Sequence, residues 1–312
     1  MDDDLDARLG FAPDYDAPIP YMQRTRDYYR AIGYTAPYRW AHHIDAPFAV
    51  LGKKLGDARV ALITTAAPYQ PGKGDQGPGA AYNGSAKFYA VYSGDTTAAH
   101  DLRISHIGYD RVHTTATDSG TWFPLPALLR AVAAGRVGAL TQRFHGAPTN
   151  RSHRVTIETD APEILRRCRE DGADAAVLVP NCPVCNQTCS LVARHLEANG
   201  IPTVVMGAAK DIVEHAGVAR FLFSDFPLGN SAGKPHDAVS QAETLELALR
   251  LLESAVGPRT TMQSPLRWTA SADWKLDYLN VDRISPDELQ RRRAEFDRQK
   301  ELARPNRVEK AA

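Results

Sequence analysis

The sequence of 312 residues lacks any apolar run close to the roughly 20 residues that a membrane-spanning helix requires. Its first residues, MDDDLDARLG, are acidic and contain no apolar segment of the kind found in a secretory signal. Neither sign of charge is in excess, because 37 basic residues balance 37 acidic residues. A protein that binds nucleic acid usually has a basic excess. We therefore expect a cytoplasmic protein that binds neither membrane nor nucleic acid.

Cysteine is scarce, and its four occurrences are unevenly distributed. Cys182, Cys185 and Cys189 lie within eight residues, whereas Cys168 stands apart. In a cytoplasmic protein, a close cysteine pair is more typical of redox chemistry or metal binding than of a structural disulfide. There is no second pair to complete a usual structural zinc set, and an iron–sulfur cluster would need a further cysteine. We therefore expect no metal site, although a zinc-bound pair stays an alternative.

The sequence around the cysteines predicts a strand, a helix and a second strand. The apolar run 175–180 is typical of a buried strand, and Pro183 suits the first position of a helix. Cys182 would then cap this helix and Cys185 would lie one turn inside it, while Gly200 would end it. A helix N-terminus lowers the pKa of a thiol. We therefore expect Cys182 to be the more acidic, nucleophilic thiol and Cys185 the resolving thiol.

The rest of the chain also alternates between apolar strands and amphipathic helices, which predicts an α/β fold. We expect a largely parallel sheet flanked by helices, with two similar lobes as one arrangement, and a helical C-terminal tail. Strands are expected at 59–65, 103–107, 137–140, 175–180, 204–207 and 221–223. The expected division is an N-terminal arm at 1–47, an N-terminal α/β lobe at 48–155, a C-terminal α/β lobe with the Cys-x-x-Cys pair at 156–256, and an irregular and helical tail at 257–312.

Ligands of open α/β sheets bind beyond the carboxyl ends of the strands. Three loops that follow expected strands, 66–85, 181–185 and 224–237, are therefore expected to converge around Cys182. Histidine can act as a general acid near neutral pH, whereas carboxylate and amide side chains can bind substrate. A local hydrogen bond or a capping role is the alternative for each. The candidate substrate-binding residues are Asn181, His106, Asp225, Asn230 and His236.

Several segments, matching in order, resemble the selenoprotein B family, the substrate-binding reductases for glycine, betaine, sarcosine and D-proline. The cysteine/selenocysteine region of that family is similar to VPNCPVCNQTCSLVARHLEANGIPTVV. Further matching segments are RVALITTAA, SHIGYDRVHTTATDSGTWFPLPALLRAVAAGRVGAL and FPLGNSAGKPHD. The start of cysteine-containing homologues is similar to PYMQRTRDYYRAIGYTAPYRW. The resemblance covers roughly residues 18–256.

The resemblance implies reductive cleavage of a carbon–nitrogen bond in an amino acid or an N-methylated derivative. A thiolate or selenolate attacks the α-carbon, a neighbouring thiol resolves the adduct, and a dithiol donor such as thioredoxin returns the electrons. On this chain the two roles would fall to Cys182 and Cys185, and cysteine replaces the selenocysteine of characterised members. The resemblance also implies an oligomer with a partner subunit that carries a pyruvoyl group, and no cofactor on this chain.

Two other functions fit the cysteine pair. A general thiol-disulfide oxidoreductase is suggested by C-P-V-C, which resembles the glutaredoxin pattern. Thioredoxin-like domains, however, place their cis-proline much farther from the pair than Pro202, which follows Cys185 by 17 residues. The other alternative is a non-catalytic subunit whose cysteines are structural or zinc-bound.

Overall fold

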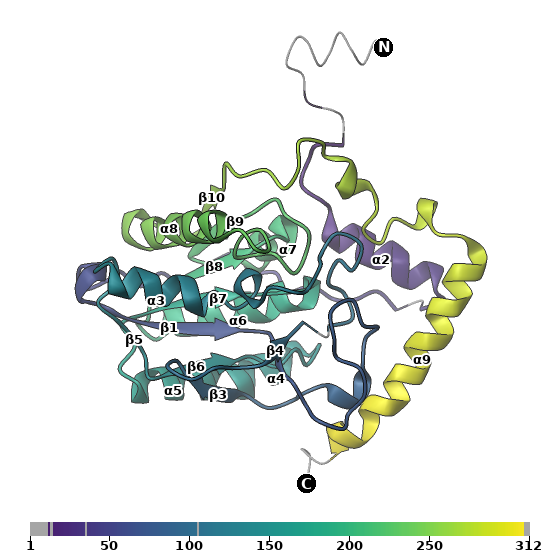
Figure 1. The fold of residues 1–312 in the computed structure, drawn as a ribbon, viewed down its shortest axis with the longest axis horizontal. Helices are drawn as coiled ribbons and strands as arrows, with labels where there is room; N and C mark the ends of the chain where they lie inside the picture. Colours follow the sequence, from purple (N-terminus) through teal and green to yellow (C-terminus); the bar gives the residue numbers. More distant parts are fainter. Residues whose placement is uncertain (1–11, 13–14, 35, 105, 309–312) are drawn as a thin grey trace.

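An eight-stranded, mostly parallel sheet forms the centre of the protein (Figure 1). The computed structural model describes residues 12, 15–34, 36–104 and 106–308. The strand order is β10-β9-β8-β7-β1-β6-β3, with β5 also beside β1, and β3 alone runs antiparallel to its neighbour. The strands are β1 (Arg59–Thr64), β3 (Tyr92–Asp95), β5 (Ala139–Leu140), β6 (Arg143–Gly146), β7 (Ala175–Val179), β8 (Thr203–Gly207), β9 (Arg220–Phe223) and β10 (Thr260–Gln263).

Helices cover both faces of the sheet, which explains why its central strands are continuous apolar runs. Along β7, Val177 and Val179 face one buried cluster, whereas Ala176 and Leu178 face another. The first cluster contains residues of α3 (Leu125–Ala133) and α8 (Ala238–Ser254), and the second those of α5 (Ala161–Glu170), α6 (Pro183–Ala198) and α7 (Lys210–Ala216). Short α4 (His153–Val155) leads through the π-helical turn Thr156–Asp160 into α5. Single 3₁₀ turns lie at Leu55–Asp57, Gly84–Ala86, Ser119–Thr121, Asp273–Leu276 and Val281–Arg283.

The strands of segments 48–155 and 156–256 form one sheet rather than two lobes. β1 from the first segment pairs in parallel with β7 from the second, in a register that runs from Val60 opposite Ala175 to Thr64 opposite Val179. The chain passes from β1 to β6 on one side of the sheet, and from β7 to β10 on the other. The boundary between β1 and β7 is therefore the switch point of the topology, where open α/β sheets bind their ligands.

The predicted α/β class and the parallel sheet are confirmed, and two local predictions are wrong. The expected strand at 103–107 is reduced to β4 (Leu102–Arg103), which pairs antiparallel with β2 (Ala67–Pro68) outside the main sheet, and residue 105 lies outside the described residues. The segment expected to be irregular after 257 contains β10, whose half-exposed residues leave no apolar run to detect. Among the described residues, no helix is long and apolar enough to cross a bilayer.

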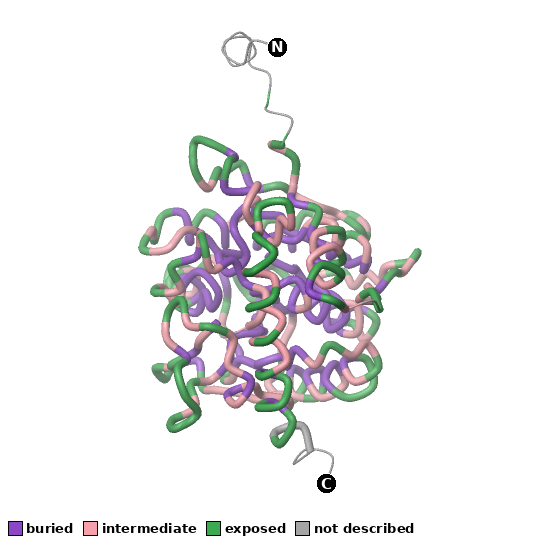
Figure 2. Tube along the Cα trace, turned by 90° about the vertical axis from the view of Figure 1, so that its right-hand side faces the viewer, coloured by how far each residue is buried: buried purple, intermediate pink, exposed green. Residues whose placement is uncertain are grey.

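Two helices lie beyond the carboxyl ends of the strands, namely α2 (Tyr21–Ala31) and the long α9 (Pro286–Val308) (Figure 1). The start of α9 is capped, since the hydroxyl of Ser285 accepts a hydrogen bond from the backbone N–H of Glu288. Farther along, the side chain of Gln299 accepts a 2.7 Å hydrogen bond from the backbone of Gly84. Figure 2 looks onto this side, where the turns of α9 alternate between exposed and partly buried. The mostly polar α9 therefore has one packed face.

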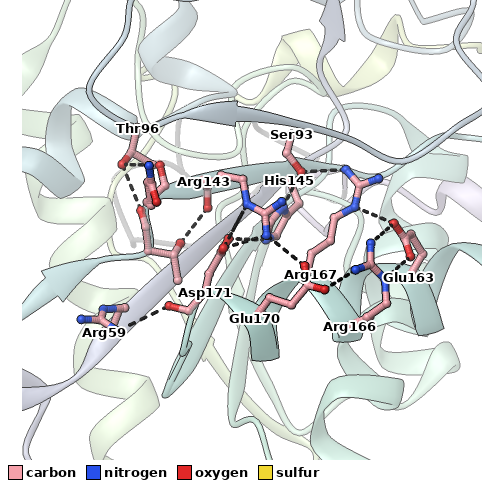
Figure 3. Close-up of polar contacts among 12 residues, drawn as sticks. Arg59, Ser93, Thr96, Arg143, His145, Glu163, Arg166, Arg167, Glu170 and Asp171 are labelled. Carbon is pink, nitrogen blue, oxygen red and sulfur yellow. Dashed lines mark hydrogen bonds and ion pairs between the residues drawn. The ribbon is translucent and has the colours of Figure 1, made fainter.

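A polar network joins one edge of the sheet to α5 (Figure 3). His145 is fully buried, its Nδ1 atom lies 2.9 Å from the hydroxyl of Ser93, and its Nε2 atom lies 3.5 Å from the carboxylate of Asp171. Arg143 binds the same carboxylate, and Arg167 donates a 2.7 Å hydrogen bond to Ser93. Burial lowers the pKa of His145 to about 4, which keeps its imidazole neutral. The network fixes β3 and β6 to the helix that covers them.

Because His145 is neutral in the folded protein, we expect the free energy of unfolding to fall as the pH is lowered. Its pKa is about 4 in the folded protein against 6.5 for the free side chain, so the unfolded chain binds a proton first as the pH falls. The contribution of neutral His145 to the free energy of unfolding is complete above pH 6.5 and is lost towards pH 4. About 2 kcal/mol of it is lost by about pH 5. Urea unfolding at about pH 7 and about pH 5 should show a smaller pH-dependent loss for His145→Gln than for the wild type.

His42→Gln, which changes an exposed histidine, is the matched control and should keep the wild-type pH dependence. Equal pH dependence in the wild type and in His145→Gln would contradict the neutral, buried state of His145.

Candidate active site

The cysteine pair lies at the switch point of the sheet, where the chain leaves β7 and enters α6. Cys182 is the N-cap of α6, and its sulfur accepts a 3.2 Å hydrogen bond from the backbone N–H of Cys185. Pro183 occupies the first helical position, as predicted. The two sulfur atoms are 2.6 Å apart, and both thiols are free and buried, with Cys182 only 2% exposed. The predicted strand–cap–helix arrangement is therefore confirmed.

The two thiols differ in the groups that surround them. Burial raises the pKa of Cys182 well above 9.0, and the single cap N–H does not compensate for it. Burial alone would also raise the pKa of Cys185, but hydrogen bonds from Cys182 and His106, the charge of His106 and the hydroxyl of Thr149 lower it well below 9.0. These surroundings favour Cys185, and not Cys182 as expected, as the more acidic thiol. Cys185 is the better thiolate because three side chains stabilise its charge.

A cavity of about 520 Å³ lies over Cys182, whereas Cys185 lies behind it and is not part of the cavity wall. The wall combines residues of α2, of α9 and of the loops that follow β1 and β6. Aromatic and cationic side chains dominate it. The aromatic residues are Tyr29, Tyr38, Tyr82, Phe88, Tyr89, Tyr278 and Phe296, and the cationic ones are Lys87, Arg151, Lys300 and Arg304. Cys182 is thus the thiol that a bound small molecule can reach.

His106 lines the same cavity, and a half-buried arginine fixes its loop. The guanidinium of Arg111 donates hydrogen bonds to the backbone carbonyls of His106 at 2.7 Å and Ile107 at 3.1 Å. The hydroxyl of Tyr278 donates a 2.8 Å hydrogen bond to the carbonyl of Gly108. These contacts hold the imidazole next to Cys185. His106 can therefore exchange protons with the thiol pair or with a molecule in the cavity.

The structure brings together Cys182, Cys185 and His106 among the residues singled out from the sequence. Asn181 precedes the pair and is fully buried, and neither its amide oxygen nor its amide nitrogen has a hydrogen-bond partner among the described residues. Its side chain does not line the cavity. The loop 224–237 lies next to the turn, because the hydroxyl of Ser231 donates a 2.8 Å hydrogen bond to the carbonyl of Pro180.

The other three candidates are engaged elsewhere in the fold. Asp225 forms an ion pair with the buried Lys275, at 2.5 Å. The amide of buried Asn230 donates to the hydroxyl of Thr114, at 2.7 Å, and thereby fixes its own loop. His236 is exposed, and its Nε2 atom lies 2.9 Å from the hydroxyl of Thr117. None of these three lines the cavity over Cys182.

Sequence reasoning missed most of the cavity wall. Thr149 and Arg151 follow β6, a strand that was not predicted from the sequence. Arg151 adopts a positive φ of 56°, which is uncommon for a residue other than glycine. Tyr29 comes from α2 and Phe296 from α9, which are far from the cysteines in sequence. The density of tyrosine and arginine in DYYRAIGYTAPYR was a signal that could have directed attention to α2.

The remaining cysteines belong to the hydrophobic core. Cys168 and Cys189 are buried in the cluster between the sheet and helices α5 and α6. Burial raises the pKa of Cys168 to about 12 and that of Cys189 well above 9.0, so both stay protonated. Among the described residues, no three His, Cys, Asp or Glu side chains are grouped to hold a metal ion. Cys182 and Cys185 are therefore the cysteines of the CPVCNQTC segment that lie at the cavity and not in the core.

The chain is 30% identical over 193 residues to the gamma subunit of D-proline reductase from Acetoanaerobium sticklandii. The aligned part is 61% of this chain and 76% of that protein. No protein-family model matches the chain, and no solved structure matches it.

The surroundings of the thiol pair predict that Cys185 titrates first. Ultraviolet thiolate absorbance should show one thiol that ionises well below 9.0, and Cys185→Ser should remove this titration. His106→Gln should move it to higher pH, because the imidazole no longer stabilises the thiolate. Cys189→Ser, in the core, should leave it unchanged. If Cys182→Ser removes the titration and Cys185→Ser keeps it, the two pKa values are assigned in the wrong order.

Proposed function

The chain belongs to the family of the gamma subunit of D-proline reductase, and from this premise we propose that it is the thiol-bearing component of a reductase that cleaves a carbon–nitrogen bond. One observation carries the proposal. Cys182 lies in the wall of a cavity that can hold a small molecule, and a second thiol lies 2.6 Å behind it. This is the arrangement that a nucleophile and a resolving thiol require.

In the first step of the proposed reaction, Cys182 is the nucleophile. Its proton passes to the sulfur of Cys185, which leaves a thiolate facing the cavity. That thiolate attacks the substrate carbon that bears the nitrogen, so that a sulfur–carbon bond forms and the carbon–nitrogen bond breaks. The electron pair of the broken bond leaves with the nitrogen, which takes a proton, and His106 is the proton donor in the cavity wall.

In the second step, Cys185 resolves the adduct. Cys185 first gives the proton that it took from Cys182 to His106, which lost its own proton to the nitrogen. The Cys185 thiolate then attacks the sulfur of Cys182, a disulfide forms, and the sulfur–carbon bond breaks with its electron pair on carbon, which His106 can protonate. The balance is one carbon–nitrogen bond and two thiols converted to one carbon–hydrogen bond, one nitrogen–hydrogen bond and one disulfide. A dithiol donor then reduces the disulfide by thiol–disulfide exchange. The family resemblance implies that this donor is thioredoxin-like.

The nitrogen of the substrate finds no free counterion in the cavity. Among the described wall residues the one carboxylate is Glu301, which pairs with Arg304 at 3.7 Å. This fits a substrate nitrogen that is held by a carbonyl group of a partner subunit, as the family's pyruvoyl group would do, and not by this chain. When bound, such a group withdraws electrons from the nitrogen and weakens the carbon–nitrogen bond. The proposal therefore requires a partner subunit and no cofactor on this chain.

A general thiol-disulfide oxidoreductase is less compatible with this site. The sulfur that a protein substrate would have to reach is only 2% exposed and lies below α9. Oxidoreductases of protein disulfides present an accessible thiolate. A small dithiol fits the cavity, whereas a thioredoxin-like protein could reach a Cys182–Cys185 disulfide only after α9 has moved. The site therefore favours a small-molecule substrate.

The two proposed thiol roles predict different failures in two variants. Cys182→Ser should lower turnover by about a thousandfold or more and form no adduct, because a serine hydroxyl is hardly ionised near neutral pH. Cys185→Ser should also block turnover, but it should accumulate an adduct on Cys182 because no thiol remains to resolve it. Intact-mass spectrometry after incubation with D-proline or other amino acids, a partner subunit and a dithiol would measure both.

Cys189→Ser is the matched control, since it alters a cysteine of the same helix that lies in the core. It should turn over near the wild-type rate. Zinc release together with a lower melting temperature in both site variants would instead support a structural metal site.

A further inference from the structure

Arg151 stands out among the cations of the cavity wall. Its guanidinium lies 5.4 Å from the ring centre of Tyr29 and 5.9 Å from those of Tyr38 and Phe296. In the described part of the chain, no carboxylate forms an ion pair with it. Its backbone is held at a positive φ of 56°, a conformation that costs free energy and persists where surrounding contacts maintain it. The protein therefore holds an arginine in place without supplying its anion.

A second cavity, of about 700 Å³, adjoins the one over Cys182. The two share part of their walls, and Arg151 belongs to both. The described wall of the second cavity contains no aspartate or glutamate, but it does contain Arg39, Lys300 and three histidines. One of these, His153, has a buried Nε2 atom without a hydrogen-bond partner. An acid-free concave surface of this kind attracts anions and raises their local concentration.

We propose that Arg151 binds the carboxylate of the substrate and that the anion reaches it through the second cavity. This inference rests on the proposed function and deepens it. A planar guanidinium binds a carboxylate with two parallel hydrogen bonds. The exposed guanidinium of Arg151 is free to do so, while the three aromatic rings beside it limit its orientations. The carboxylate would orient the substrate while its nitrogen, which has no free counterion here, stays available to a partner. Arg151 is thus a substrate-binding residue that selects for acids.

A pair of alkylating reagents tests this without knowledge of the substrate. Iodoacetate and iodoacetamide have nearly the same size and the same leaving group, but only the first carries a carboxylate. In both reactions a bond forms between the cysteine sulfur and carbon, and iodide leaves. The ratio of their rates at Cys182, read by peptide mass spectrometry on the full chain, therefore reports recognition of the carboxylate and cancels differences in thiol reactivity.

Arg151→Gln should lower the rate of iodoacetate at Cys182 by roughly ten- to a hundredfold, the range expected for one charge-assisted hydrogen-bonded pair. The rate of iodoacetamide should stay near that of the wild type. Arg151→Lys should keep part of the preference, because it retains the charge but not the planar fork. Arg154→Gln is the matched control, since Arg154 is nearby in sequence, 76% exposed and outside both cavity walls.

Three results would overturn the assignment. An equal loss for both reagents in Arg151→Gln would mean that Arg151 supports the structure of the cavity and not its selectivity. Unchanged rates for both reagents in Arg151→Gln would mean that Arg151 does not meet the carboxylate. A larger loss in Lys87→Gln would move the anchor to Lys87, which also lines the cavity. If the iodoacetate preference depends on Arg151 but no carbon–nitrogen cleavage is found, the reductase proposal fails and the anion site remains.

Discussion

The site depends on the hydrogen bond between the backbone N–H of Cys185 and the sulfur of Cys182, which starts α6 directly after the buried strand β7. A helix that begins there places its first turn at the switch point of the sheet. The sulfur of the cap residue then faces the cavity, while the sulfur one turn later points to the interior. The difference between a reachable thiol and a hidden thiol is therefore a consequence of helix geometry.

Burial of the thiol pair determines how easily each thiol ionises and which hydrogen-bond donors must lie beside it. A thiolate in an apolar interior is unstable unless donors surround it, and here Thr149 and His106 are placed next to Cys185. His106 is in turn held by Arg111, whose guanidinium binds three backbone carbonyls. In the proposed reaction, the negative charge would rest on Cys185 and would pass to Cys182 when a proton moves between the two sulfur atoms. This order explains how a buried nucleophile can be kept ready without being exposed to solvent.

The parts of the structure that follow from local rules could be predicted from the sequence. Cys182 before α6, Asp237 before α8 and Ser285 before α9 are caps, and each accepts a hydrogen bond from the backbone N–H three residues later. Residues that depend on distant partners could not be assigned. Asp225 looked like a site residue because nothing nearby in sequence shows that Lys275 neutralises it. In the same way, the two expected lobes are one sheet because β1 pairs with a strand more than a hundred residues later.

The cavity wall shows why a mostly polar helix can be essential to an apolar site. α9 packs through Phe296 on Tyr29 and Tyr34. It also requires the absence of a side chain at Gly84, where a Cβ atom would come within 2.3 Å of the backbone carbonyl of Gln299. The helix thereby helps to bury Cys182, while a cavity remains over its sulfur that a small molecule can enter.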